Sequence, residues 1–300
     1  MNRDDSSPGG LTAGGPPRFR RAADGPPDGS QADQGTEPMS VVELGRFMDD
    51  LADASGQAIL PFFRAQFGLD DKARGGAPFD PVTEADRAAE VVLRAMIGQT
   101  FPGHGILGEE FGAERTDAEC VWVLDPIDGT RAFIAGLPTW GTLIGLNRKG
   151  VPVRGLMHQP YLGERFTGDG RNARLRGPAG ERTLRTRRCA DLGQAILATT
   201  DPRLFATGEE AERFRALEGQ VRMSRYGTDC YAYCMLAAGQ IDLVVEAGLK
   251  PYDIVALIPI VEGAGGRVTA WDGGSAAGGG RIVAAGDPRL HEAALKVLNP

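Results

Sequence analysis

A helical pattern of apolar residues begins near residue 40 of this 300-residue chain. Ser40 and Glu43 have the spacing of a capping box, in which two side chains satisfy free backbone N–H groups at the start of a helix. Apolar residues then recur every three or four positions, the period of one helix face, at Leu44, Phe47, Met48, Leu51, Ile59 and Phe62. The pattern predicts a first helix that begins after Ser40 and a second helix over residues 83–97.

Short apolar runs that are typical of strands follow these helices. Residues 121–124 form one run, and residues 140–147 and 151–157 form two more, which a polar turn at residues 148–150 joins. A further strand is expected at residues 164–167. The second half alternates expected strands, at residues 196–199, 241–246, 266–269 and 282–285, with expected helices, at residues 209–217, 229–238, 252–263 and 288–298. Mixed strands and helices predict a layered α/β (α+β) protein.

The first 38 residues differ in composition from the rest of the chain. They contain seven glycines and six prolines and almost no large apolar side chain, so they bury too little surface to offset the entropy of ordering. We therefore expect a disordered leader over residues 1–38, with Met39 as a candidate for the physiological start. The remainder is expected to form an N-terminal α+β lobe, residues 39–185, and a C-terminal α/β lobe, residues 186–300.

Composition and charge argue against several classes of protein. The formal net charge is -7 and the arginine clusters are short, so no basic stripe indicates a nucleic-acid partner. No apolar run reaches the roughly 18 residues that span a bilayer, and the N-terminus lacks the apolar centre of a secretory signal. The four cysteines have no nearby histidine that would complete a zinc site. We expect reduced thiols and a cytoplasmic protein.

Acidic residues gather in four short segments where a simple core would not place them. The segments are residues 80–86, 108–110, 121–130 and 250–253. Taken singly, three have ordinary explanations: Asp86 as part of a capping box, Glu109 and its neighbour as a solvated turn, and Asp253 as a charge near a helix N-terminus. Their occurrence together favours one shared site.

The third segment is the most informative. A buried strand ends at Asp125, and Asp128 follows three residues later, directly before Gly129 and Thr130. Ligand sites in α/β proteins lie at the carboxyl ends of strands. Pro126 restricts the backbone between the two carboxylates, and Gly129 allows the backbone to approach a ligand closely. Free amides at a helix start here would receive a phosphate, whereas a tight Asp-rich turn is the alternative interpretation.

A group of packed carboxylates needs cations. The carboxylates repel one another and stay ionised only where positive charge neutralises them. All the candidates are hard oxygen ligands, with no His or Cys among them, which favours Mg²⁺, or Mn²⁺ as a substitute, over Zn²⁺. Two such ions can bind a phosphate, activate a water and stabilise a leaving alkoxide.

Together, these motifs resemble those of the inositol-monophosphatase superfamily. The matching pieces are residues 80–86, 108–110, 122–130 and 252–253 with 262–266, and the resemblance extends from Ser40 to the C-terminus. It implies the layered α-β-α-β-α sandwich of the sugar phosphatases and in-line attack of water on phosphorus without a covalent phospho-enzyme. It also implies a small phosphorylated metabolite as substrate and a homodimer.

The resemblance assigns the metal ligands position by position. Glu109, Asp125 and the backbone carbonyl of Ile127 would hold one Mg²⁺. Asp125, Asp128 and Asp253 would hold the second. A third, weaker ion would bind Glu109, so the resemblance implies two or three ions in the site.

The resemblance also assigns the groups that handle water and phosphate. Thr130, hydrogen-bonded to Asp86, would orient the attacking water and help to deprotonate it, with Glu109 counted among the catalytic groups. The amides of Gly129 and Thr130 would receive the phosphate. For Arg131, contact with substrate and contact with a partner subunit both stay open.

The substrate is indicated by a closer resemblance to the histidinol-phosphatase branch than to the inositol branch at residues 131–144, 225–233 and 246–253. Histidinol phosphate carries an ammonium and an imidazole, so its pocket should offer acids, and alignment with the family places Asp229 and Glu246 there. Glu246 would serve either substrate, which makes Asp229 the discriminating residue; its alternative interpretation is a helix N-cap. The resemblance thus predicts a histidinol-phosphatase, with an inositol-1-monophosphatase, a fructose-1,6-bisphosphatase or a bisphosphate nucleotidase as alternatives.

Overall fold

Two large β-sheets carry the fold in the computed structural model, which describes residues 40–65, 69–71, 81–205 and 208–300. The first sheet contains β3 (Gly105–Gly108), β4 (Gly112–Glu114), β5 (Cys120–Asp128), β6 (Gly141–Arg148), β7 (Val151–Gln159), β8 (Glu164–Gly168), β9 (Ala173–Gly177) and β10 (Gly180–Thr183). Their spatial order is β10-β9-β8-β7-β6-β5-β3-β4. Only the β3–β5 pair is parallel, so the sheet is mainly antiparallel.

The second sheet has a mixed topology. It contains β11 (Ile196–Thr199), β12 (Met223–Tyr226), β13 (Leu243–Leu249), β14 (Arg267–Ala270) and β15 (Gly280–Ala285). The spatial order is β12-β11-β13-β15-β14, in which β11 runs parallel to both of its neighbours. A separate antiparallel pair joins β1 (Leu69–Asp71) and β2 (Pro81–Thr83).

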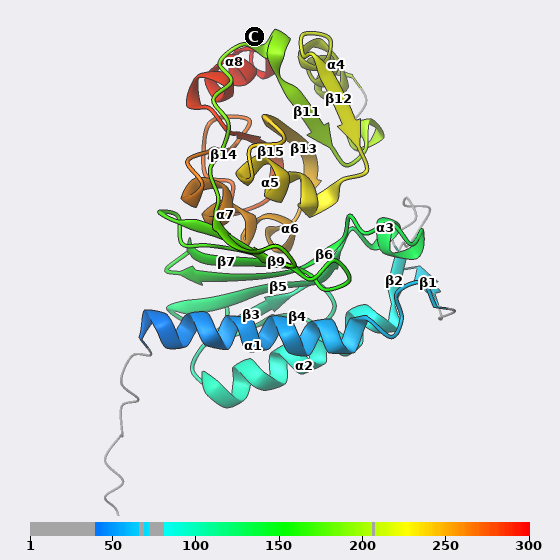
Figure 1. The fold of residues 1–300 in the computed structure, drawn as a ribbon, viewed down its shortest axis with the longest axis vertical. Coiled ribbons are helices and arrows are strands. Elements are labelled where there is room, and N and C mark those ends of the chain that lie inside the picture. The colour runs from blue at the N-terminus through cyan, green and yellow to red at the C-terminus, as the bar shows by residue number, and fades with distance from the viewer. Residues whose placement is uncertain (1–39, 66–68, 72–80, 206–207) are drawn as a thin grey trace, which may run out of the picture. The chain divides into compact units, whose positions relative to one another are not determined.

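Helices form three layers around these sheets (Figure 1). The outer face of the eight-stranded sheet is covered by α1 (Val41–Ile59) and α2 (Glu84–Thr100); the space between the sheets holds α5 (Asp229–Ala237), α6 (Pro251–Ile254) and α7 (Leu257–Gly263); the far face of the five-stranded sheet is covered by α4 (Glu209–Glu218) and α8 (Pro288–Leu298). Short α3 (Thr130–Ile134) follows β5, and 3₁₀ turns span Leu192–Gln194 and Pro202–Leu204. This order of layers confirms the predicted α-β-α-β-α sandwich.

The first two helices begin where the sequence predicts. Ser40 Oγ accepts the amide of Glu43 at 3.2 Å, and the Glu43 carboxylate accepts the amide of Ser40 at 2.9 Å. Thr83 and Asp86 form the same reciprocal arrangement at the start of α2. The apolar faces of both helices bury their side chains against Trp122 of β5, which attaches this layer to the centre of the sheet.

Glycines let the middle helical layer lie directly on the eight-stranded sheet. A side chain at Gly155 of β7 would overlap the carbonyl oxygen of Ala256, just before α7. A side chain at Gly168 of β8 would overlap the carbonyl oxygen of Pro259. This close approach buries Leu257 in the apolar cluster that the middle layer shares with both sheets.

The predicted single helix over residues 252–263 is wrong, because the structure divides it into α6 and α7. Pro259 has no N–H to donate to the carbonyl of Val255, four residues earlier, so a continuous helix would lack that bond. The proline instead lies in the first turn of α7, where an N–H has no helical partner in any case.

Parts of the sequence analysis concern residues outside the described ranges. The leader over residues 1–38, Met39 as a start and Asp80 of the first acidic segment all lie there. The division into lobes at residues 39–185 and 186–300 also stays a prediction. None of the helices in the described part of the chain combines the length and the apolar character that crossing a bilayer needs.

We expect Gly155→Ala to lower the free energy of unfolding by about 1–3 kcal/mol, since the added methyl group must displace α7 from the sheet. Gly98→Ala is the matched control, because a Cβ at this position of α2 meets no atom within 4 Å. Urea denaturation of both variants measures the difference. Equal stability of the two variants would contradict the close packing.

Candidate active site

A one-residue irregularity at the end of β5 places two aspartates on the same side of the strand. Asp125 pairs with Leu143 of β6, and Asp128 pairs with Gly141, so β5 uses three residues where β6 uses two. Successive side chains of a regular strand alternate between its faces, which would send Asp125 and Asp128 to opposite sides. The extra residue in β5 cancels that alternation.

Two further contacts hold residues 126–129, at the irregular end of β5. The hydroxyl of buried Thr142 donates to the carbonyl of Pro126 at 2.8 Å. Gly129 has a φ of 84°, and a Cβ there would lie 3.1 Å from the Cβ of Asp229 and 3.2 Å from the Cα of Trp140. The left-handed backbone and the lack of space both favour glycine. Gly129 therefore lets β5 turn into α3 against the start of α5.

Two carboxylates of β5 and one of α6 meet at this point. Asp125, Asp128 and Asp253 each offer one oxygen, and these oxygens lie within 4.8 Å of one another. The amide of Cys230, at the start of α5, donates to Asp128 at 2.7 Å. The amide of Lys250 donates to Asp253 of α6 at 2.6 Å. Backbone donors thus orient the carboxylates of Asp128 and Asp253. We call Asp125, Asp128 and Asp253 together the acid cluster.

Burial and mutual repulsion raise the pKa of each carboxyl in the acid cluster. Burial is the largest cause for Asp125, followed by the charges of Glu109, Asp128 and Asp253, and it also leads for Asp128. It raises the pKa of Asp253 to about 7. Oδ1 of Asp125 is buried and has no hydrogen-bond partner among the described residues. An all-oxygen group with an unsatisfied buried acceptor fits a hard divalent cation such as Mg²⁺.

Glu109 joins this group from the turn after β3. Its amide donates to the carbonyl of Leu124 at 3.2 Å, which ties the turn to β5. Its charge is the second cause, after burial, of the raised pKa of Asp125. The structure therefore brings Glu109 to the acid cluster, while its roles as a metal ligand and catalytic group stay predictions.

Buried Glu90 of α2 holds the same turn through its backbone. One carboxylate oxygen accepts the amide of Glu110 at 2.7 Å, and the other accepts the amide of Phe111 at 3.2 Å. Arg94, one helical turn further on, donates to Glu90 at 2.8 Å and to the carbonyl of Gly112. Three donors thus fix a fully buried carboxylate directly behind the turn that carries Glu109.

Glu90 is not among the predicted site residues, although the sequence contains a signal for its role. Glu90 lies between Ala89 and Leu93 on the buried face of α2, where an unpaired acid would be costly. A side chain at Gly108 would overlap the Glu90 carboxylate. The acid in the helix and the glycine that ends β3 therefore fit together.

The structure confirms the capping box of Asp86 and gives Thr130 a different partner from the one expected. Asp86 accepts the amide of Thr83 at 2.8 Å and its hydroxyl at 2.5 Å. The hydroxyl of Thr130 donates to the carbonyl of Ile127 at 3.0 Å. A hydroxyl donates one proton, so the expected bond to Asp86 requires Thr130 to turn, whereas the Ile127 carbonyl keeps a second lone pair for a metal. Both stay predictions.

Asp229 lies beside the end of β5, which carries Asp128. It is the first residue of α5, and Thr228 takes the cap position, so the N-cap interpretation of Asp229 is wrong. Asp229 has a φ of 42° and packs against Gly129. Burial raises its pKa to about 6, while the positive charge of Arg131 opposes that rise. A partly buried acid therefore adjoins the expected phosphate-binding amides.

Glu246 of β13 is occupied by donors from its own chain. One oxygen accepts the amide of Thr200 at 2.7 Å and its hydroxyl at 3.0 Å, and the other accepts the hydroxyl of Thr199 at 3.2 Å. Burial raises its pKa to about 8, and Asp229 is close enough to contribute. These bonds place Glu246 behind the two threonines, so direct contact with substrate stays a prediction.

The sequence pattern of the inositol monophosphatase family matches residues 43–299. The chain belongs to this family. Membership confirms the resemblance that the acidic motifs indicate, and the acid cluster is built from three of those motif residues. Phosphatases of this family act on small phosphorylated substrates and generally use Mg²⁺.

Individual relatives carry different names. The chain is 46% identical over 276 residues to the chloroplastic bifunctional phosphatase IMPL2 of Arabidopsis thaliana, covering 87% of this chain and 77% of the relative. It is 38% identical to the histidinol-phosphatase of Mycobacterium tuberculosis, covering 79% and 92%. The solved structure of an inositol monophosphatase from Zymomonas mobilis is 43% identical, covers 87% of this chain and 100% of its own, and has a TM-score of 0.77. The chain is thus a phosphatase whose substrate needs a separate argument.

Asp125→Asn should raise the melting temperature of the metal-free phosphatase by a few degrees, since it removes one of several repelling buried charges. The same change should abolish the rise in melting temperature that Mg²⁺ causes in the wild type, because a ligand that binds only the folded state stabilises it. Thermal unfolding with EDTA and with Mg²⁺ measures both effects. A metal-free variant that melts below the wild type would argue against repulsion in the acid cluster.

Glu90→Gln should weaken Mg²⁺ binding about 10–100-fold, the usual effect of losing a group that orients a metal ligand. The neutral amide pairs less well with Arg94 and accepts at only one of its two end atoms. Isothermal titration with Mg²⁺ measures the affinity, and Glu84→Gln, an exposed change on the same helix, is the control. Equal affinities in the two variants would show that the turn keeps its position without the Glu90 charge.

Proposed function

We propose that this phosphatase is a Mg²⁺-dependent histidinol-phosphatase that converts histidinol phosphate and water to histidinol and phosphate. The observation that carries the proposal is the position of Asp229, a partly buried acid packed against Gly129 next to the acid cluster. A substrate whose phosphate lies at Gly129 and Thr130 would extend its organic part past this carboxylate. Histidinol is cationic there, so Asp229 would pair with it.

The residues of the chain divide the work of hydrolysis among them. Glu109, Asp125 and the Ile127 carbonyl would hold one Mg²⁺, and Asp125, Asp128 and Asp253 a second, with Glu109 also available to a third. When bound, these ions supply the positive charge that offsets the phosphate and lowers the pKa of an attacking water. The chain itself fixes the carboxylates through the irregularity in β5 and through the amides of Cys230 and Lys250.

Proton handling and phosphate binding would follow from the residues after β5. The Thr130 hydroxyl, once turned from the Ile127 carbonyl, would position the water and pass a proton toward Asp86. The amides of Gly129 and Thr130 would bind the phosphate oxygens. Glu246 would support the cationic side of the pocket from behind Thr199 and Thr200, since its charge lies near that of Asp229.

Inositol-1-monophosphatase is the second candidate, supported by the 43% identity to the solved inositol monophosphatase. The two readings differ at Asp229, because an inositol ring offers hydroxyl groups and no cation. Fructose 1,6-bisphosphate is a third substrate to test within the same chemistry. A homodimer and a cytoplasmic location remain expectations from the sequence analysis.

We expect wild-type enzyme with Mg²⁺ to prefer histidinol phosphate over inositol 1-phosphate and fructose 1,6-bisphosphate by orders of magnitude in kcat/KM. Asp229→Asn removes the charge and keeps a residue type that tolerates a positive φ. It should lower kcat/KM for histidinol phosphate by about 10–100-fold, as expected for one hydrogen bond to a charged group, chiefly through KM.

p-Nitrophenyl phosphate, a phosphate ester whose organic part carries no charge, is the matched control substrate for Asp229→Asn. Its turnover should change little, because it carries no cation for Asp229 to bind. An equal loss on both substrates would assign Asp229 to the metal site and overturn its role in specificity. A preference of the wild type for inositol 1-phosphate would overturn the substrate while leaving the phosphatase chemistry intact.

A further inference from the structure

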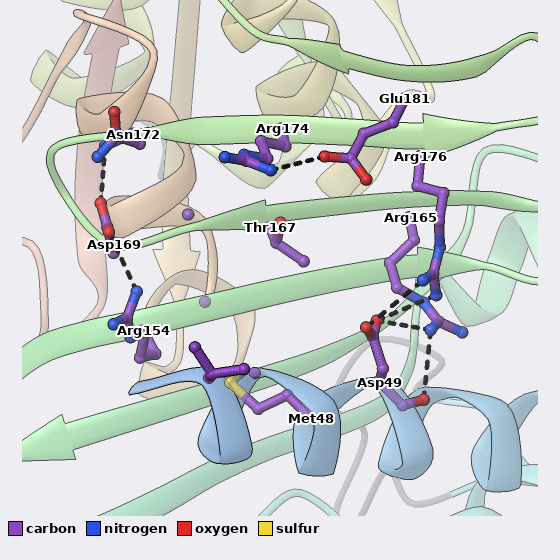
Figure 2. Close-up of a pocket in the computed structure, with 14 residues that line it drawn as sticks. Met48, Asp49, Arg154, Arg165, Thr167, Asp169, Asn172, Arg174, Arg176 and Glu181 are labelled. Atoms are coloured by element: carbon purple, nitrogen blue, oxygen red, sulfur yellow. Dashed lines mark hydrogen bonds and ion pairs between the residues drawn. The ribbon is translucent and has the colours of Figure 1, made fainter. Parts of the chain in front are cut away.

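A cavity of about 500 Å³ opens between α1 and the outer strands of the eight-stranded sheet (Figure 2). None of the residues that line it belongs to the acid cluster. Its volume lies within the range of small-molecule sites in proteins. Figure 2 shows charged side chains of the sheet on one side of this space and Met48 and Asp49 of α1 on the other.

Four arginines from three neighbouring strands line the cavity: Arg154 of β7, Arg165 of β8, and Arg174 and Arg176 of β9. The residues that alternate with them, such as Phe166, point into the core on the opposite face. Arg165 lies directly opposite Arg176 in the β8–β9 register. Like charges at directly opposed positions destabilise a sheet, and Asp49 of α1 offsets this repulsion by pairing with both arginines.

Helix α1, on the facing side of the cavity, contains a residue that lowers helix stability. Gly45 lies inside the helix, where glycine lowers stability relative to alanine. A Cβ at Gly45 would meet no atom within 4 Å, so packing does not require the glycine. Its effect is to leave open space between Val42 and Met48, which also line the cavity. Departures from local rules of this kind are expected at functional sites.

The acids near the arginines leave some of the arginine N–H groups available to a ligand. Arg165 is 5% exposed and pairs with Asp49 and Asp53, while Asp49 also serves Arg176 at 3.1 Å. Arg174 pairs with Glu181 at 2.8 Å, and both side chains are at least half exposed. Exposed ion pairs contribute little, whereas phosphate and carboxylate groups bind arginine through two parallel hydrogen bonds. An incoming anion can therefore replace the exposed pairs.

We propose that this cavity binds a small anionic metabolite through phosphate or carboxylate groups. Arg174 and Arg176 contact the anion, buried Arg165 supplies fixed positive charge, and Val42 and Met48 contact an apolar part of the ligand. The molecule bound there is not hydrolysed, because none of the metal-binding carboxylates lines the cavity. The inference is independent of which phosphate ester the active site hydrolyses.

Isothermal titration of the metal-free, full-length protein with pyrophosphate in EDTA tests this site. Without metal, the acid cluster repels anions, so binding reports on the arginine cavity. We expect one pyrophosphate per chain, bound at least tenfold more weakly by Gly45→Leu, which fills the space above α1. Gly98→Leu is the matched control, since it adds the same side chain at an open helical position outside the cavity.

The arginines are tested by the double variant Arg174→Ala with Arg176→Ala, which should also weaken binding at least tenfold. Arg182→Ala, an exposed change on β10 outside the cavity, should not. Unchanged Mg²⁺-dependent phosphatase activity in all these variants shows that they are folded. The proposal is overturned if wild-type protein does not bind pyrophosphate, or if the Gly45 and arginine variants bind it as their controls do.

Discussion

Repulsion among carboxylates that the fold forces into one buried place is the constraint on which the site depends. Asp125 and Asp128 lie at the end of β5, and Asp253 lies in α6, a short helix of the middle layer. Hydrogen bonds from neutral donors would reduce this repulsion, yet Oδ1 of Asp125 has no hydrogen-bond partner among the described residues. The fold therefore carries an electrostatic cost that a cation removes, which is how a catalytic metal becomes part of the stability of an enzyme.

The layers around the acid cluster hold the carboxylates in place despite this electrostatic cost. The irregular step in β5 would be flexible in an isolated hairpin. Here, Trp122 anchors the same strand to the outer helices, and the backbone before α7 approaches β7 closely at Gly155. Rigid neighbours on both faces of the sheet keep the carboxylates together despite their repulsion.

Much of this arrangement was predictable because the decisive signals are local. The capping boxes at Ser40 and Thr83 depend on residues three positions apart, and the family motifs mark Asp125, Asp128 and Asp253 directly. The break between α6 and α7 could have been read from Pro259. Contacts between distant segments were not predictable from one sequence: the hold of Glu90 on the turn at Glu110, and the threonines that occupy Glu246, depend on which elements the fold brings together.

The junction of Glu90 with Gly108 has a consequence for how this chain can change over evolutionary time. Because the carboxylate fills the volume where a Cβ at position 108 would lie, position 108 cannot gain a side chain while Glu90 is present. A larger residue at 108 is tolerated only after the acid at 90 has been shortened, and that step releases the turn that bears Glu109. Homologues should therefore show these two positions changing as a pair, and redesign of the metal site should begin from both together.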